Sequence, residues 1–507
     1  MRNQGRSARL HTPVCDLFGC EYPVVLAGMG GVSRSELVAA VINAGSYGFL
    51  GMVREPPEKI RSEIQRIRER SDREFGINMI PAATDPDLLE RQIEVCIEQR
   101  VASVCLFWDI YPEVIKRFLD AGIIVVHQIG SEQDAAEAEA AGCHVLIVQG
   151  IEAGGHVRGK LPLRELLPRI LRSTDLPVLA AGGIITGDDL AENLRAGAQG
   201  VVMGTAFLAT TESYAHDYHK QRIVEAKTDE TILTDIFHIN WPFGAMTRVM
   251  PNSVTRTVIN GVSVSGERKI IGVEEGHPIY LYSTDSPLRN TTGDLEAMAI
   301  YAGSGAHLIK NIEPVAVRLQ TIINEAGARM TPDPDRFHPG TDDIQLFSSP
   351  CFIPEAEKSY MGLASDDDIT GFLEELLDIE RDFARVVIRS WLECHDTQYM
   401  NFFRTLYQAK ARWCKLLVNW IVYYRGRHQL RTGDIYRNAM SIHDIHDRVI
   451  FITVEQSLVI KKIREMLVKI DVTQLQEDLQ DILTCHIATK LIARKIIGTR
   501  QVFPGID

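Results

Sequence analysis

Short apolar runs alternate with amphipathic stretches along the first part of the chain. Eight such runs are rich in β-branched residues and bounded by Gly or Pro, at residues 23–29, 47–52, 75–80, 102–108, 123–129, 144–150, 177–183 and 200–207. Because their hydrophobicity is continuous rather than alternating, they predict parallel strands that are covered on both faces. Eight strand and helix units in about 200 residues predict the α/β class and a (β/α)8 TIM barrel.

Two of the intervening helices have recognisable ends. Ser33 stands three residues before Glu36, which predicts a capping box at the start of a helix over residues 33–44. A second helix, over residues 131–141, is followed by Gly142, and glycine commonly ends helices. These ends separate the helices from the strands that the apolar runs predict.

A Gly-rich turn after the first run allows a competing interpretation. The string GMGGVS at residues 28–33 nearly matches the dinucleotide-binding fingerprint, but Ser33 stands in the place of the third glycine. No acidic residue clearly ends the second predicted strand. The count of eight units therefore favours the barrel over a dinucleotide-binding sheet.

The repeating pattern stops after the eighth unit. Residues 231–282 are irregular and predict a lid or small subdomain over the barrel mouth. Residues 330–363 are rich in Pro, Asp and Ser, as interdomain linkers are. From residue 365 onward, apolar residues at helical spacing predict four helices in an antiparallel bundle. The expected domains are a flexible N-terminus at 1–10, a barrel at 11–330 with its lid insertion, a linker at 331–364 and a ferritin-like bundle at 365–507.

The composition is that of an ordinary globular protein, with 45% hydrophobic and 24% charged residues. The net charge of −13 argues against nucleic acid as the main partner, because phosphate backbones require a basic face. Nine cysteines without paired spacing indicate a reduced chain. No apolar run is long enough for a signal peptide or a membrane span, so we expect a cytoplasmic protein without a membrane partner.

Function in a barrel of this kind lies at the C-terminal ends of the strands. The seventh run ends in Gly182 and Gly183, and the eighth is followed by Gly204 and Thr205. Glycines at both places allow backbone N–H groups to approach a ligand closely, which favours a phosphate site beside a helix N-terminus. The alternative is that these glycines only relieve crowding at the strand ends.

Two polar residues at the same face are candidates for chemistry. His156 lies in a Gly-rich loop after the sixth run, where an imidazole with a pKa near 6.5 suits a general base. It could instead bond its own backbone. Asn78 lies near the end of the third run, where its amide could meet the edge of a heterocycle or simply cap the strand.

Four segments of the chain resemble one known family. They are QGIEAGGHVRG at 149–159, AAGGI at 180–184, MGTAFLATTES at 203–213 and YAGSGAHLIKNIEP at 301–314. Together they make residues 11–330 similar to the nitronate monooxygenases, formerly called 2-nitropropane dioxygenases. The string at 149–159 is the most specific of the four.

The resemblance implies a barrel that binds FMN and oxidises alkyl nitronates, or nitroalkanes, with dioxygen. It also implies that His156 is the catalytic base, which would take the acidic α-proton of a nitroalkane. The implied flavin contacts are Asn78, Gln149 and Gly154, with Gly183, Gly204 and Thr205 at the phosphate beside Gly182.

Departures from the family pattern keep other functions open. Val202 stands where many relatives have Gln, and residues 303–305 read Gly-Ser-Gly where many have Gly-Gln-Ser. A flavin-dependent enoyl-thioester reductase that uses NAD(P)H shares the loop around His156. A third hypothesis makes the barrel a flavin-binding scaffold, or a subunit of a biosynthetic complex that acts through the helical domain.

A ferritin-like bundle could hold two irons if Glu residues and Glu-x-x-His pairs faced inward. The nearest candidates are Glu380, His395, Glu455 and His486. The required spacing fails, because Lys410 and Leu483 stand where acidic residues are needed. The sequence therefore predicts no metal site, and we take the bundle as a candidate surface for a homodimer.

Overall fold

The computed structural model describes two compact units, and each is considered by itself. One comprises residues 18–329, and the other joins residues 10–17 to the C-terminal helices. The predicted linker, apart from Ala364, and the predicted N-terminal segment, apart from Leu10, lie outside the described residues. The described ranges are 10–174, 176–242, 244–259, 269–330, 364–394, 396–424, 434–470 and 472–497.

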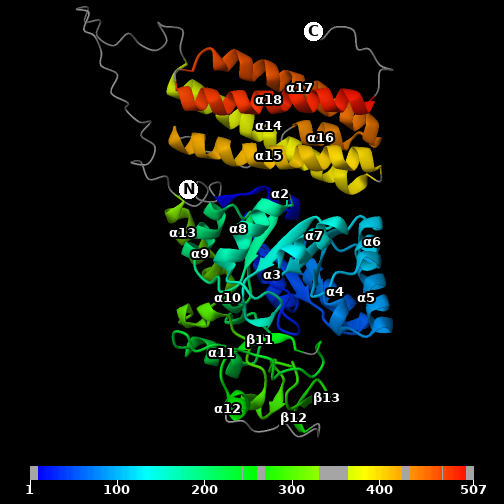
Figure 1. Ribbon diagram of the computed structural model, residues 1–507, viewed down its shortest axis with the longest axis vertical. Coiled ribbons are helices and arrows are strands. Elements are labelled where there is room, and N and C mark those ends of the chain that lie inside the picture. The colour runs from blue at the N-terminus through cyan, green and yellow to red at the C-terminus, as the bar shows by residue number, and fades with distance from the viewer. Residues whose placement is uncertain are drawn as a thin grey trace, which may run out of the picture. The chain divides into compact units, whose positions relative to one another are not determined.

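The predicted TIM barrel is confirmed. Eight parallel strands close in the order β1-β2-β3-β4-β5-β6-β8-β9, and β1 pairs with β9 from Val24 opposite Val201 onward. Figure 1 shows the strands enclosed by helices. The strands are β1 (Val24–Leu26), β2 (Tyr47–Gly51), β3 (Gly76–Met79), β4 (Ser103–Phe107), β5 (Ile124–Ile129), β6 (Val145–Gln149), β8 (Val178–Ala181) and β9 (Gly200–Met203). The closed barrel also excludes the dinucleotide-binding sheet.

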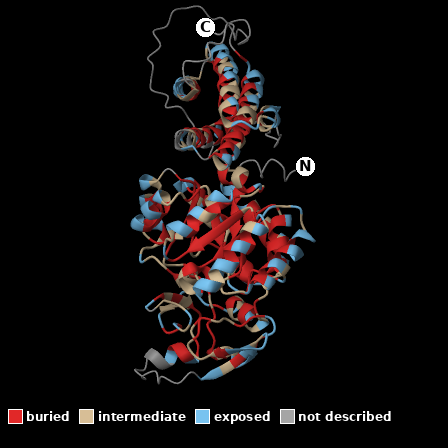
Figure 2. Ribbon diagram, turned by 90° about the vertical axis from the view of Figure 1, so that its right-hand side faces the viewer, coloured by how far each residue is buried: buried red, intermediate tan, exposed pale blue. Residues whose placement is uncertain are grey.

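Burial explains why the strands are apolar without alternation. All three residues of β1 and all five of β2 are buried, because one face meets the barrel interior and the other meets helices. Figure 2 shows this buried layer as a continuous band through the barrel. Burying each large aliphatic side chain stabilises the fold by about 1.5–3 kcal/mol, so eight such strands form its dominant core.

The helices around the barrel follow the predicted alternation. Proline occupies the first position of α4, α5 and α6, where its missing N–H leaves no helical bond unmade. The helix α13 (Val315–Arg329) packs against α9 and α3, so it completes the ring from beyond the insertion. The others are α3 (Ser35–Asn43), α4 (Pro57–Arg68), α5 (Pro86–Glu98), α6 (Pro112–Asp120), α7 (Glu132–Ala140), α8 (Leu163–Ser173), α9 (Gly187–Ala196), α10 (Thr205–Leu208) and α11 (Asp217–Val224).

One predicted helix start is wrong. The N-cap of α3 is Arg34, which makes no side-chain capping bond. The Ser33 hydroxyl instead donates to Ala27 O at 2.8 Å and accepts from Met29 N at 3.2 Å. Ser33 therefore stabilises the turn after β1, and its hydroxyl is no longer free for the helix. The other predicted end is confirmed, because Gly142 has a left-handed φ of 94° after α7.

The irregular insertion contributes strands to two small sheets. The first has the order β10 (Ile232–Thr234), β11 (Met246–Val249) and β7 (Gly155–Val157), and the second joins β12 (Ile270–Glu274) to β13 (His277–Tyr280) and β14 (Thr292–Gly293). Because β7 directly follows the end of β6, the first sheet lies at the C-terminal end of the barrel strands. Figure 1 shows the insertion gathered on that side of the barrel, with the short helix α12 (Ser253–Ile259).

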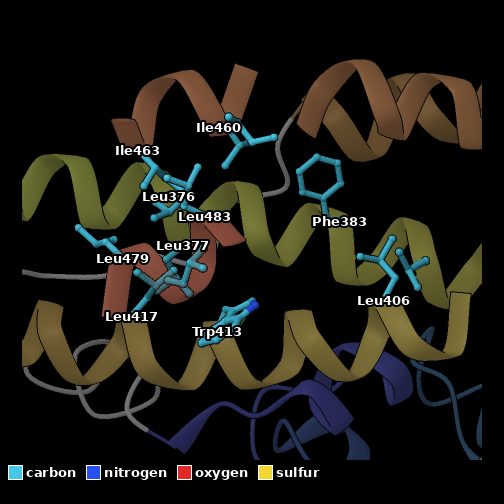
Figure 3. Close-up of a cluster of buried hydrophobic side chains, with 14 of the residues drawn as sticks. Leu376, Leu377, Phe383, Leu406, Trp413, Leu417, Ile460, Ile463, Leu479 and Leu483 are labelled. Atoms are coloured by element: carbon cyan, nitrogen blue, oxygen red, sulfur yellow. The ribbon is translucent and has the colours of Figure 1, made fainter. Parts of the chain in front are cut away.

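The predicted helical region after residue 365 is confirmed. Four long helices, α14 (Asp366–Glu393), α15 (Thr397–Tyr423), α17 (Ile445–Leu467) and α18 (Thr473–Ile497), accompany the short α16 (Asp434–Met440). The pairs α14 with α15 and α17 with α18 pack side by side. Their shared apolar core is drawn in Figure 3, where leucines from α14, α15 and α18 meet isoleucines from α17. Across the described residues, no helix has the length and apolarity needed to cross a bilayer.

The N-terminal residues contribute to this helical unit. The helix α2 (Pro13–Phe18) places Leu17 against the apolar core of the bundle. Asp16 Oδ1 lies 3.1 Å from His11 Nε2 and 3.4 Å from Arg385 Nε of α14. The side chains of His11 and Asp16 are nearly buried, whereas that of Arg385 is partly exposed. The unit is therefore built from both ends of the described chain.

Candidate active site

A cavity of about 750 Å³ opens at the C-terminal ends of the barrel strands. Its walls come from the strand ends and from the inserted sheets. Ligand sites of enzymes with this barrel lie at the same face. All eight residues predicted from the sequence line this one cavity, namely Asn78, Gln149, Gly154, His156, Gly182, Gly183, Gly204 and Thr205.

The glycines after β8 adopt backbone conformations that other residues rarely take. Gly182 has φ of 117° and Gly183 has φ of 70°, so successive N–H groups can turn toward one ligand. A β-carbon on Gly183 would lie only 3.0 Å from Ser304 Oγ, so a larger residue here would occupy the space between the two loops. Opposite them, Gly204 caps α10, and Thr205 Oγ1 accepts a bond from Gly303 N at 3.0 Å. The arrangement fits a phosphate group.

Asn78 lies at the end of β3 and is buried. Its Nδ2 donates to Cys105 O at 3.1 Å, which fixes the amide against the neighbouring strand β4. The backbone at Gly28 passes directly against it, because a β-carbon there would lie 2.1 Å from Asn78 Cβ. The glycine of the first loop thus makes room for the amide, rather than for a dinucleotide.

Gln149 holds the loop that carries His156. Its Nε2 donates to His156 O at 2.9 Å, and its Oε1 accepts from Arg158 N at 3.1 Å. The amide therefore bonds the backbone of β7 at His156 and of the residue that follows β7, Arg158. This makes Gln149 a positioning residue for His156 as well as part of the cavity wall.

His156 lies inside a box of aromatic rings. The indole of Trp241 stacks on the imidazole with centroids 3.4 Å apart, and Trp108 and Tyr301 approach to 6.5 and 5.8 Å. Its Nε2 is buried and has no partner among the described residues. Burial holds the pKa of the His156 imidazole well below its usual range, and the Arg54 guanidinium lowers it further. The imidazole is therefore neutral at neutral pH and has a lone pair or proton available to a ligand.

The other residues around His156 were not predicted from the sequence. Trp241 falls in the segment that was predicted only as a lid, and Tyr301 begins a segment identified through the family resemblance. Trp108 ends the fourth apolar run, and Arg54 lies two residues beyond the second. For Trp108 and Arg54, this position just beyond a barrel strand was the signal that could have identified them.

In the helical unit, two of the four metal candidates come together. His486 Nε2 lies 2.7 Å from a carboxylate oxygen of Glu380, and Lys410 Nζ lies 3.1 Å from both groups. An ammonium group thus stands among the groups that a metal would need. Glu455 has no described bond to this cluster, and His395 lies outside the described residues. No cluster of three or more His, Cys, Asp or Glu suited to a metal occurs in the described part of the chain.

Comparison with known families divides the chain in the same two parts. A family model described as nitronate monooxygenase matches residues 11–325. A second model, described as a domain of unknown function, DUF6306, matches residues 367–495. The eight predicted site residues all fall within the first match.

Curated relatives match the barrel part. A protein of Mycobacterium tuberculosis named (3aS,4S,5R,7aS)-5-hydroxy-7a-methyl-1-oxo-octahydro-1H-indene-4-carboxyl-CoA dehydrogenase is 38% identical over 266 residues, which are 51% of this chain and 70% of that protein. A probable nitronate monooxygenase of Staphylococcus haemolyticus is 32% identical over 261 residues, 43% of this chain and 73% of its own.

Solved structures match the same part. FabK of Thermotoga maritima has a TM-score of 0.53 at 28% identity, covering 63% of this chain and 97% of its own. Nitroalkane oxidase of Streptomyces ansochromogenes has a TM-score of 0.52 at 28% identity, covering 62% and 99%. The dehydrogenase, the monooxygenase and the oxidase are oxidoreductases by name, but they differ in the substrates that their names give.

Proposed function

The chain belongs to the nitronate monooxygenase family over residues 11–325, and on this basis we propose that its barrel is an FMN-dependent oxidoreductase that oxidises small alkyl nitronates with dioxygen. The observation that carries the proposal is the neutral, unpartnered Nε2 of His156 in the same cavity as the glycine cradle. On this proposal a base and a phosphate site line the same cavity, as flavin-dependent removal of a carbon-bound proton requires.

The proposed flavin site uses backbone more than side chains. The N–H groups around Gly182, Gly183, Gly204 and Thr205 would hold the FMN phosphate, and Asn78 would meet the ring system. The bound flavin would supply the electron transfer between substrate and dioxygen, and the chain would supply orientation and access. The proposed site needs no excess of positive charge, which agrees with the net charge of −13.

His156 would act on the proton of a neutral nitroalkane. Its Nε2 lone pair takes the α-proton, so the C–H bond breaks, an N–H bond forms, and the substrate becomes the nitronate anion. Trp241 covers one face of the ring and keeps water from it. A substrate that enters as the nitronate needs no proton transfer, so His156 would only orient it.

The charges around the cavity favour a small substrate over a CoA thioester. A CoA group brings several phosphate charges to the mouth of a site, and these require basic partners. Two arginines lie on the cavity wall against four carboxyl groups, namely Arg34 and Arg54 against Glu55, Glu274, Glu275 and Asp285. A polyanion would meet stronger repulsion there than a singly charged nitronate.

The test is nitronate-dependent oxygen uptake by the purified full chain loaded with FMN. We expect His156→Ala to lose most turnover of a neutral nitroalkane, by about 100-fold or more, and much less turnover of the preformed nitronate. The control is His443→Ala, which changes an exposed histidine of the helical unit.

Two results would contradict the proposal. Equal loss on both substrates would remove the role of His156 as a base. Reduction of a short enoyl thioester by NAD(P)H, without any nitronate activity, would replace the reaction with that of an enoyl reductase.

We also propose how the chain works as a whole. The barrel at 11–330 would carry the reaction, the segment at 331–364 would link it to the bundle at 365–507, and the bundle would offer a surface for a homodimer. None of the eight described cysteines forms a disulfide bond, and seven of them are buried. Reduced thiols suit the reducing cytoplasm, where we propose that the protein acts.

A further inference from the structure

We propose that Arg54 is the substrate receptor of this site, and that it binds a planar two-oxygen anion such as a nitronate between its guanidinium and His156. This inference rests on the proposed function and names the charge and shape of the substrate. It concerns a residue that neither the glycine pattern nor the histidine loop points to.

The first support is the position of Arg54 in the barrel. It lies three residues beyond β2, at the face where the other strands contribute the cavity wall. Its backbone is left-handed, with φ of 60°, a conformation that costs most residues about 1 kcal/mol or more and that glycine would adopt more easily.

The second support is the difference between the two arginines of the cavity. Arg34 is occupied, because its Nη1 bonds Glu275 at 2.7 Å and its guanidinium lies 3.8 Å from the ring centre of Tyr214. Arg54 has one polar partner in the described part of the chain, Asp285, at 3.4 Å. A guanidinium with five donors and one distant partner retains most of its capacity for an anion.

The third support is the setting of His156. The groups around its ring are Trp108, Trp241 and Tyr301, none of which is charged at neutral pH. Among the described residues, the Arg54 guanidinium is the charged group that lowers the pKa of the imidazole, and it also acts on Tyr301 together with Asp285. A substrate beside His156 therefore lies in the field of a single nearby positive charge.

This geometry favours a particular class of substrate. A guanidinium binds planar two-oxygen anions through two parallel hydrogen bonds, and a nitronate has this shape. The anion would compete with Asp285 for Arg54. In neutral nitroalkanes the same bonds would strengthen as negative charge develops on the nitro oxygens while His156 takes the proton.

The experiment compares Arg54→Met with Arg54→Lys in the full chain. For Arg54→Met we expect KM for propyl-1-nitronate to rise about tenfold or more, and binding of inorganic nitrate, followed by calorimetry, to fall by a similar factor. Arg54→Lys should be intermediate, because it keeps the charge but not the paired bonds. The matched control is Arg73→Met, a loop arginine that bonds Glu21 and precedes β3 at the other end of the barrel.

The pH profile supplies a readout that a merely structural role would not change. Removing the positive charge raises the pKa of His156, so the acid limb of nitroalkane turnover should move to higher pH in Arg54→Met and stay in place in Arg54→Lys. Unchanged KM, nitrate binding and pH limb in Arg54→Met would overturn the inference. A wild-type protein that binds nitrate through Arg54 but oxidises no nitronate would instead overturn the proposed function and leave the anion receptor standing.

Discussion

Lys410 occupies the centre of the helical unit, where three ionisable side chains meet without solvent. Its Nζ lies 3.1 Å from Glu380 and from His486, and all three side chains are at most 1% exposed. Burial alone would raise the pKa of Glu380, but the Lys410 ammonium and His486 lower it to about 2. The cluster therefore contains a carboxylate and an ammonium, with His486 held neutral by burial and by Lys410.

We expect Lys410→Met to destabilise the helical unit by about 3–5 kcal/mol, because it leaves the Glu380 carboxylate buried without its cation. Urea unfolding of the full chain, followed in the transition of the helical unit, measures this loss. Adding Glu380→Gln to Lys410→Met should restore part of the lost stability, because the buried carboxylate is then replaced by a neutral amide. The control is Lys461→Met, since Lys461 is 75% exposed and its contact with Glu465 at 3.9 Å is worth less than about 1 kcal/mol. Equal losses in the two lysine variants would contradict the argument.

The same residues show how far sequence reasoning reaches at this scale. Glu380 and His486 could be selected as inward-facing by their helical spacing, and Lys410 was visible as the residue that breaks a metal pattern. That the three groups touch depends on how α14, α15 and α18 are rotated against one another, which no local pattern specifies. Gly182 and Gly183 of the cavity were easier to predict from the sequence, because their left-handed backbone excludes most other residues.

Arg54, Trp108 and Trp241 could not be grouped from the sequence for the same reason. Arg54 follows β2, Trp108 follows β4 and Trp241 lies in the insertion. Only the closed fold brings these three residues around His156. Each is ordinary in its own segment.

At the scale of elements, the strands of the barrel were predictable and those of the insertion were not. Burial on both faces makes every barrel strand a continuous apolar run, which is a local signal. The strands β7, β10 and β11 are three or four residues long with mixed burial, and β7 pairs with a strand about 90 residues later. Their order depends on partners that no local pattern identifies.

A pair between His11, which precedes α2, and Asp16 within α2 makes a pH-dependent contribution to the stability of the helical unit. Burial would lower the pKa of His11, but the Asp16 carboxylate 3.1 Å away outweighs it and raises the pKa from 6.5 to about 10. A raised histidine pKa stabilises the folded state fully below pH 6.5 and loses that effect as pH rises to about 10. His11→Gln should therefore cost stability at about pH 6, on the order of 3 kcal/mol, and almost none at about pH 10.

Unfolding of the helical unit at several pH values between about 5.5 and 10 measures this difference. His443→Gln, at an exposed position, is the control and should show no such trend. A difference in unfolding free energy between wild type and His11→Gln that did not change with pH would show that the pair between His11 and Asp16 is not its cause.

At the scale of the whole molecule, the residues proposed for catalysis belong to one unit. The eight predicted site residues, Arg54 and the aromatic box all lie within residues 18–329, and the family match to nitronate monooxygenases covers nearly the same range. The lower boundary has a physical reason, because the ring of Phe18 stacks on Tyr47 of β2 with centroids 4.3 Å apart. The upper boundary has another, because α13 completes the ring of helices by packing on α9 and α3.

We therefore expect a fragment of residues 18–329 to fold, to bind FMN and to keep the KM of the full chain for a nitronate within about twofold, since no residue of the proposed site is removed. Flavin fluorescence quenching and oxygen uptake are the measurements. A fragment ending at residue 314 is the control, because it lacks α13 and leaves the apolar faces of α9 and α3 uncovered. It should fail to fold or to retain flavin. A fragment of residues 18–329 that folds by circular dichroism but binds no FMN would mean that the helical unit takes part in the site, and the bundle would then have a catalytic role rather than one in assembly.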